Sequence, residues 1–97
     1  MALFDTHSHC YFPDLTAKES EVFASMLACN VTHSVQIGTN VVSSEESIEL
    51  AKKYPNTYAT VGIHPTDCQD FSEDSLVKFF DSLDALIENN REYIVAI

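Results

Sequence analysis

The chain has 97 residues and a formal net charge of −10, and these two values exclude several classes of protein. Its 15 acidic and 5 basic side chains are spread evenly, so residues 1–48 and 49–97 each carry a charge of −5. The sequence therefore contains no basic patch that could bind a nucleic acid or an anionic membrane. With 45% hydrophobic residues the chain is not a disordered acidic segment either, and we expect one globular domain over residues 1–97.

The cysteines and the apolar runs indicate the compartment. No apolar run approaches the roughly 20 residues needed to cross a bilayer, and the N-terminal residues lack the basic start of a secretory signal. The three cysteines, Cys10, Cys29 and Cys68, are odd in number and form no CxxC pair. Free thiols indicate a reducing compartment, so we predict a cytoplasmic protein with no membrane partner. The sequence does not indicate an oligomeric state.

The first half of the chain predicts a strand, a helix and a second strand. Leu3 begins a short apolar strand, and Thr16 with Glu19 fits the capping-box pattern that opens a helix. Apolar residues then recur at helical spacing as far as Asn30, a residue type that often ends helices. Residues 32–37 are rich in β-branched side chains and predict a buried strand.

The second half of the chain repeats this order. A second capping-box pattern, Ser43 with Glu46, opens a helix that a proline ends, and residues 58–63 form the next predicted strand. Ser72 can cap a third helix, in which apolar residues recur every three or four positions. Residues 93–97 predict a fourth strand.

The spacing of these elements indicates an α/β fold. Strand starts lie about 25–35 residues apart with one helix between them, as βαβ units with a parallel sheet require. Two continuations fit this pattern: a doubly wound sheet, or the first half of an eight-stranded barrel of ~250 residues. No glycine-rich nucleotide-binding loop follows any predicted strand, which disfavours the nucleotide-binding forms of the doubly wound sheet.

The most specific local pattern is Asp5-Thr6-His7-Ser8-His9, at the end of the first predicted strand. Alternation along a strand predicts that His7 and His9 share one face, where two imidazoles can bind a divalent cation. Asp5 would continue the same face and could orient an imidazole or bind weakly. Two polar histidines at a strand end are also common without any metal, so this pattern needs support from its position.

A third histidine, His64, is predicted to lie at the same edge of the sheet as His7 and His9, which supports a shared site. The third predicted strand runs into His64, and Pro65 stops it there. Because the carboxyl ends of parallel strands meet at one edge of a sheet, we expect His64 to face His7 and His9. A turn residue is the alternative interpretation of His64. His33 begins its strand at the opposite end, and we interpret it as structural, with its hydrogen bond satisfied.

These residues match a known family. The segment Phe4-Asp5-Thr6-His7-Ser8-His9 resembles the opening signature of the TatD family of metal-dependent deoxyribonucleases. Three further blocks, residues 31–39, 54–65 and 94–97, agree with that family in order and spacing. The two histidines are shared with amidohydrolases and PHP-type phosphoesterases, whereas the Gly-Ile-His-Pro block at 62–65 is more specific. The resemblance covers the whole chain, but the chain covers only the N-terminal part of such an enzyme.

The resemblance implies a TIM barrel, of which this chain would supply about four parallel strands and three helices. It implies a centre of divalent metal ions (Mg²⁺, Mn²⁺ or Zn²⁺) that hydrolyses phosphodiester bonds in DNA. His7 and His9 would bind one metal, and His64 would line the substrate side near a phosphate. The family's other ligands are a glutamate after the fourth strand, two later histidines and an aspartate. These would lie beyond Ile97, so we expect the isolated chain to be inactive.

Two alternatives remain open at this stage. One is a different metallohydrolase of the same architecture, such as an amidohydrolase, although the Gly-Ile-His-Pro block argues against it. The other is a non-catalytic module that binds a metal or a partner through the open face of a partial barrel.

Overall fold

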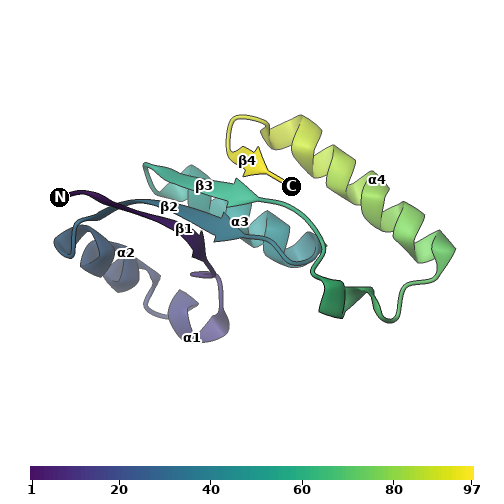
Figure 1. The fold of residues 1–97 in the computed structure, drawn as a ribbon, viewed down its shortest axis with the longest axis horizontal. Helices are drawn as coiled ribbons and strands as arrows, with labels where there is room; N and C mark the ends of the chain where they lie inside the picture. The colour runs from purple at the N-terminus through teal and green to yellow at the C-terminus, as the bar shows by residue number, and fades with distance from the viewer.

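The computed structural model describes residues 1–97, and strands alternate with helices along the whole chain (Figure 1). The strands are β1 (Leu3–Ser8), β2 (Val31–Ile37), β3 (Thr57–Thr60) and β4 (Ile94–Ala96). The helices are α1 (Pro13–Thr16), α2 (Glu19–Ala28), α3 (Val41–Lys53) and α4 (Glu73–Asn90), with a 3₁₀ turn, η1 (Pro65–Cys68), after β3. The predicted alternation is confirmed, with the short α1 added to the three expected helices. None of the helices is both long enough and apolar enough to span a membrane.

All four strands are parallel, and they lie side by side in chain order, β1-β2-β3-β4. A doubly wound sheet would reverse its strand order at a switch point. A barrel instead adds each new strand next to the previous one, with a helix on the outside of every crossover. The architecture is therefore the α/β arrangement of successive TIM-barrel strands, as the resemblance to the TatD family implied.

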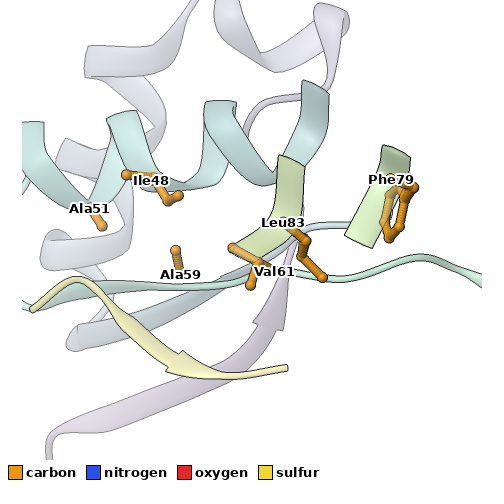
Figure 2. Packing of buried hydrophobic residues seen from close by; sticks show 6 residues of the cluster. All are labelled: Ile48, Ala51, Ala59, Val61, Phe79 and Leu83. Carbon is orange, nitrogen blue, oxygen red and sulfur yellow. The ribbon is translucent and has the colours of Figure 1, made fainter. Parts of the chain in front are cut away.

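The main core lies between the sheet and the helices α3 and α4 (Figure 2). Its side chains come from one face of α3, from β3 and the residue after it, and from the apolar stripe of α4. Six buried residues form this cluster: Ile48, Ala51, Ala59, Val61, Phe79 and Leu83. Burying such side chains is the main favourable term in folding, so this cluster fixes both helices to one face of the sheet.

The opposite face of the sheet carries a row of aromatic rings. Phe4 on β1 stacks on His33 of β2 with ring centroids 5.2 Å apart, and on Tyr58 of β3 at 6.4 Å. Phe4 remains 53% exposed. The His33 ring nitrogen lies 2.8 Å from the hydroxyl of Thr32, which confirms that this histidine is hydrogen-bonded within the sheet.

The first predicted capping box is wrong. Thr16 is the last residue of α1, and its hydroxyl donates to a main-chain carbonyl within that helix. Glu19 begins α2, but its carboxylate accepts hydrogen bonds from Lys53 and, at 2.8 Å, from the hydroxyl of Tyr54. The long-range partners at the end of α3 therefore take the carboxylate that a local capping box would have used.

The other helix boundaries follow the sequence more closely. The Ser43–Glu46 box is wrong because Asn40 is the cap of α3, and it exchanges hydrogen bonds with Ser43 at 2.8 and 3.0 Å. Ser43 is thus the third residue of the helix and not its cap. Ser72 caps α4 as predicted. Asn30 follows the end of α2 with a φ of 63°, in the left-handed region that asparagine tolerates.

The third strand is shorter than predicted. Its regular pairing ends at Thr60, three residues before the expected end. Beyond it, the Val61 N–H donates to the Ala96 carbonyl at 3.3 Å and the His64 N–H donates to the Thr39 carbonyl at 2.8 Å. The segment therefore continues towards His64 held by main-chain hydrogen bonds, even though its partners there are a loop and the end of β4.

One buried amide holds the end of β1 against β2. Gln36 is fully buried, and its Oε1 accepts the Cys10 N–H at 2.8 Å. Its Nε2 donates to the hydroxyls of Ser8, at 2.8 Å, and Ser34, at 3.2 Å. Because Ser8 and Cys10 are the neighbours of His9 in the chain, this amide fixes the main chain on both sides of that histidine.

Replacement of Gln36 by leucine tests this arrangement. The variant leaves the Cys10 N–H without its acceptor, and an unsatisfied buried donor costs about 1–3 kcal/mol. We expect urea unfolding to show a loss of that size for Gln36→Leu. The same change at Gln69, the exposed second glutamine of the chain, is the matched control and should be nearly neutral. Equal stability of the two variants would contradict this role of Gln36.

The Glu19–Lys53 contact predicts a pH dependence. The hydrogen bond from the Lys53 ammonium, which outweighs partial burial, lowers the pKa of the Glu19 carboxyl below its ordinary value of 4.5. A lowered folded-state pKa gives stability that is present above the unfolded-state pKa and is lost as the pH falls through the folded-state value. Glu19→Gln should therefore be less stable than the native chain at pH 7, with the difference shrinking below pH 4.5.

The control for this measurement is Glu21→Gln. Glu21 is an exposed residue of the same helix and takes part in no ion pair. Denaturant unfolding of both variants across the pH range gives the comparison. A Glu19→Gln difference that is the same at every pH would show that the pair does not act through the charge of Glu19.

Candidate functional site

A register shift in β1 decides which side chains reach the site. Between Asp5 and Ser8, β1 advances three residues while its partner β2 advances two. The Asp5 carboxylate accepts the main-chain N–H of His7 at 3.0 Å across this irregularity. Because an extra residue interrupts strand alternation here, alternation no longer places Asp5 on the face of His7 and His9. The carboxylate contacts the main chain of His7 and not an imidazole ring.

The structure brings His7 and His9 together. Their ring centroids are 5.1 Å apart and the planes meet at 75°. The ring of Phe12 stacks on His9 at 5.0 Å, nearly parallel. No hydrogen bond occupies either ring nitrogen of His7 within this chain. The His7 ring is therefore free to offer either nitrogen to a ligand.

Hydrogen bonds determine which nitrogen of His9 carries the proton. Nδ1 lies 3.2 Å from the carbonyl oxygen of Ile37 and 2.9 Å from the hydroxyl of Tyr11, which itself donates to the same carbonyl at 2.7 Å. A carbonyl oxygen can only accept, so the network assigns the proton to Nδ1. Nε2 of neutral His9 then has a free lone pair, as a metal ligand requires.

His64 has the opposite assignment. It caps η1, and its Nδ1 accepts the N–H of Thr66 at 3.1 Å, with the Thr66 hydroxyl 2.8 Å away. A main-chain N–H can only donate, so Nδ1 of neutral His64 is unprotonated and Nε2 carries the hydrogen. His64 therefore presents a hydrogen-bond donor where His9 presents a lone pair.

The three histidines line one open hollow of about 370 Å³. Its walls come from the end of β1 and the loop after it, the end of β2 and the loop after it, and the segment from His64 into η1. Eight residues line it: His7, His9, Phe12, Ile37, Thr39, His64, Thr66 and Asp67. His64 thus faces the same space as His7 and His9, whereas Asp5 is not among the lining residues.

The donor atoms of this hollow fit part of a metal centre. Two neighbouring imidazoles suit zinc and similar divalent ions. No group of three or more histidine, cysteine, aspartate or glutamate side chains in this chain lies close enough together to hold an ion. Burial raises the pKa of the Cys10 thiol, which disfavours the thiolate that a metal would need. Two imidazoles alone would be fewer than the four ligands of a tetrahedral site.

A larger hollow, of about 680 Å³, lies between α2 and α3. Its walls carry glutamates of both helices, and its two lysines, Lys52 and Lys53, are each paired with one of them. It contains no histidine, cysteine or serine. Size alone therefore does not identify the functional site, and the converging imidazoles favour the smaller hollow.

Two residues of the site were not expected from the sequence. Tyr11 continues the period of two that links His7 and His9, and this spacing is the signal that could have indicated it. Gln36 is a polar residue inside an otherwise buried β-rich run, which is a signal for a buried hydrogen-bond network.

Comparison with known proteins identifies the family of this chain. Residues 4–97 match the family model described as TatD related DNase. MG009 of Mycoplasma genitalium, an uncharacterized metal-dependent hydrolase, is 36% identical over 100 aligned residues, which cover 100% of this chain and 36% of that protein. TatD of Salmonella typhimurium, a 3'-5' ssDNA/RNA exonuclease, is 28% identical over 78 residues, covering 77% of this chain and 30% of that protein.

A third relative agrees with these two. YabD of Bacillus subtilis, an uncharacterized metal-dependent hydrolase, is 31% identical over 74 residues, which cover 76% of this chain and 29% of that protein. The chain thus spans about a third of the length of the curated relatives that it matches. Because the family model matches nearly every residue, from position 4 to position 97, the chain belongs to the TatD-related DNase family.

Proposed function

We propose that residues 1–97 form the N-terminal part of a divalent-metal-dependent hydrolase that cleaves phosphodiester bonds in DNA. His7 and His9 hold a metal ion, His64 binds a phosphate oxygen of the substrate, and the remaining metal ligands come from outside this chain. The observation that carries the proposal is the contrast between the His9 and His64 rings, which face one hollow with opposite hydrogen-bonding character.

The metal part of the proposal rests on the free nitrogens of His7 and His9. The His9 Nδ1–H donates to the Ile37 carbonyl, the arrangement that orients metal-bound histidines and increases their basicity. Its Nε2 and a nitrogen of His7 can then bind the same ion. The ion would be Mg²⁺, Mn²⁺ or Zn²⁺, and imidazole ligands favour zinc and its neighbours among these.

The substrate part rests on His64. A phosphate oxygen accepts hydrogen bonds and carries negative charge, so the Nε2–H of His64 is a suitable partner. Its position is held by the Thr66 N–H and by the bond from its own N–H to the Thr39 carbonyl. His64 therefore offers a donor whose position is set before substrate arrives, which is the form of transition-state stabilisation that costs least reorganisation.

Asp5 acts indirectly in this proposal. Its carboxylate accepts the His7 N–H and so holds the irregular part of β1 that carries both histidines. A bound divalent ion would lower the pKa of a coordinated water and offset the charge that develops on the phosphate during hydrolysis. The chain's own contribution is to orient the imidazoles and to donate from His64.

The proposed substrate follows from the relatives. Two matched proteins, from Salmonella typhimurium and Citrobacter rodentium, are named 3'-5' ssDNA/RNA exonucleases. We propose DNA as the substrate and the cytoplasm as the location, the latter because all three cysteines are free thiols. Nothing in this proposal requires a membrane.

Titration of the isolated chain with Zn²⁺ or Mn²⁺ tests the metal site. We expect weak binding by the native chain, and His9→Ala should weaken it by more than about tenfold, since even loss of a partner behind a ligand costs about that much. His33→Ala is the matched control, because His33 is bonded to Thr32 and does not line the hollow. Equal affinity of the native and His9→Ala chains would refute the proposed site.

Cleavage assays test the rest of the function. A chimera in which this chain replaces the matching segment of the Salmonella typhimurium enzyme should cleave single-stranded DNA when divalent metal is present. His64→Ala in the chimera should lower kcat by about 10²-fold, as loss of a preorganised donor does, whereas Gln69→Ala should not. Metal binding without cleavage by a folded chimera would favour a non-catalytic module.

The isolated 97-residue chain should show no metal-dependent cleavage of single- or double-stranded DNA, because it carries only two of the ligands. Cleavage by the isolated chain that EDTA and His7→Ala both abolish would contradict this expectation. Such a result would mean that two imidazoles and water complete a working centre.

A further inference from the structure

We propose that Tyr11 is a positioning residue, whose hydroxyl fixes the tautomer and the ring orientation of His9. This inference rests on the proposed function, in which Nε2 of His9 binds a metal ion. It assigns a role to a residue that does not line the hollow itself.

The Tyr11 ring is anchored in the helical layer. The residue is only 7% exposed and belongs to a small buried cluster with Cys10, Phe23 and Leu50. These partners come from α2, α3 and the loop after β1. The ring therefore has little freedom to move, and its hydroxyl is held between the end of β2 and the His9 ring.

The hydroxyl makes two contacts that together fix a proton. It donates to the Ile37 carbonyl at 2.7 Å, so its proton is committed there and its oxygen is left as an acceptor. The same oxygen lies 2.9 Å from Nδ1 of His9, closer than the carbonyl itself at 3.2 Å. Both oxygens attract a protonated Nδ1 and repel an unprotonated one. The tautomer that leaves Nε2 free is therefore favoured.

Aromatic neighbours restrict the remaining freedom of the His9 ring. Phe12 covers one of its faces at 5.0 Å, and the Tyr11 ring meets it edge-on at 5.6 Å and 86°. With Nδ1 held by the hydroxyl, rotation of the imidazole would break a hydrogen bond and an aromatic contact at once. The orientation of the His9 ring, and with it the direction of Nε2, is thereby fixed next to His7 in the hollow.

The variant Tyr11→Phe removes the oxygen and keeps the buried ring. Histidine side-chain ¹⁵N spectra of the metal-free 97-residue chain, in mildly alkaline buffer, report the tautomer of His9 directly. We expect a protonated Nδ1 in the native chain and a clear gain of the Nε2-protonated form in the variant. Zn²⁺ affinity should fall about tenfold, in the range found when a partner behind a metal-bound histidine is removed.

Tyr58→Phe is the matched control, because it removes a tyrosine hydroxyl from β3, at a position that does not contact His9. It should change neither the His9 spectrum nor Zn²⁺ affinity, and amide spectra verify that each variant is folded. An unchanged His9 tautomer and an unchanged Zn²⁺ affinity in Tyr11→Phe would overturn the role of Tyr11.

The two readouts separate this inference from the proposed function. If Zn²⁺ binds equally well to the native chain and to Tyr11→Phe, and the His9 tautomer is the same in both, the metal site stands and the role of Tyr11 is wrong. If the variant shifts the His9 tautomer but neither chain binds Zn²⁺ or Mn²⁺, Tyr11 orients His9 and the proposed metal site fails.

Discussion

The buried amide of Gln36 is the interaction on which the arrangement of the histidines depends. β1 lies at the edge of the sheet and its register shifts twice along β2, so strand pairing alone does not fix the segment that follows it. The buried amide of Gln36 is fully hydrogen-bonded only when the Cys10 N–H and the Ser8 hydroxyl lie in these positions. The cost of an unsatisfied buried amide therefore becomes a constraint on the position of His9 between them.

Main-chain groups that can only accept or only donate a hydrogen bond give His9 and His64 different tautomers. The Ile37 carbonyl can only accept, so it keeps the proton on Nδ1 of His9, whereas the Thr66 N–H can only donate, so it keeps Nδ1 of His64 unprotonated. A hydroxyl could adapt to either tautomer, but a main-chain group cannot. The difference between a lone pair and a donor on the two Nε2 atoms thus follows from main-chain groups of fixed polarity, with the Tyr11 hydroxyl next to Nδ1 as a second contact at His9.

The fold could be predicted because it depends on hydrophobic periodicity, whereas much of the site could not. The apolar stripe of α4 and the β-rich strands repeat at periods that a sequence shows directly. The capping box at Thr16 failed because the partners of Glu19 lie more than thirty positions away, at Lys53 and Tyr54. The contact of Asp5 with the His7 main chain could not be predicted, because a bulge is invisible to strict alternation. The proposed role of Tyr11 could not be predicted either, because it depends on the main-chain carbonyl of Ile37, which is distant in the sequence.

The hollow lacks lysine and arginine side chains, so binding of a metal ion and binding of a phosphodiester would depend on each other there. No lysine or arginine lines the hollow and Asp67 does, while Lys52, Lys53 and Arg91 are already paired with glutamates. Distant acids are screened over the ~8 Å Debye length of physiological salt, so the local balance decides whether a phosphodiester can approach. Under the proposed function, cations held by His7 and His9 supply the missing positive charge. Metal and nucleic acid would then bind cooperatively, each raising the affinity for the other by the same factor.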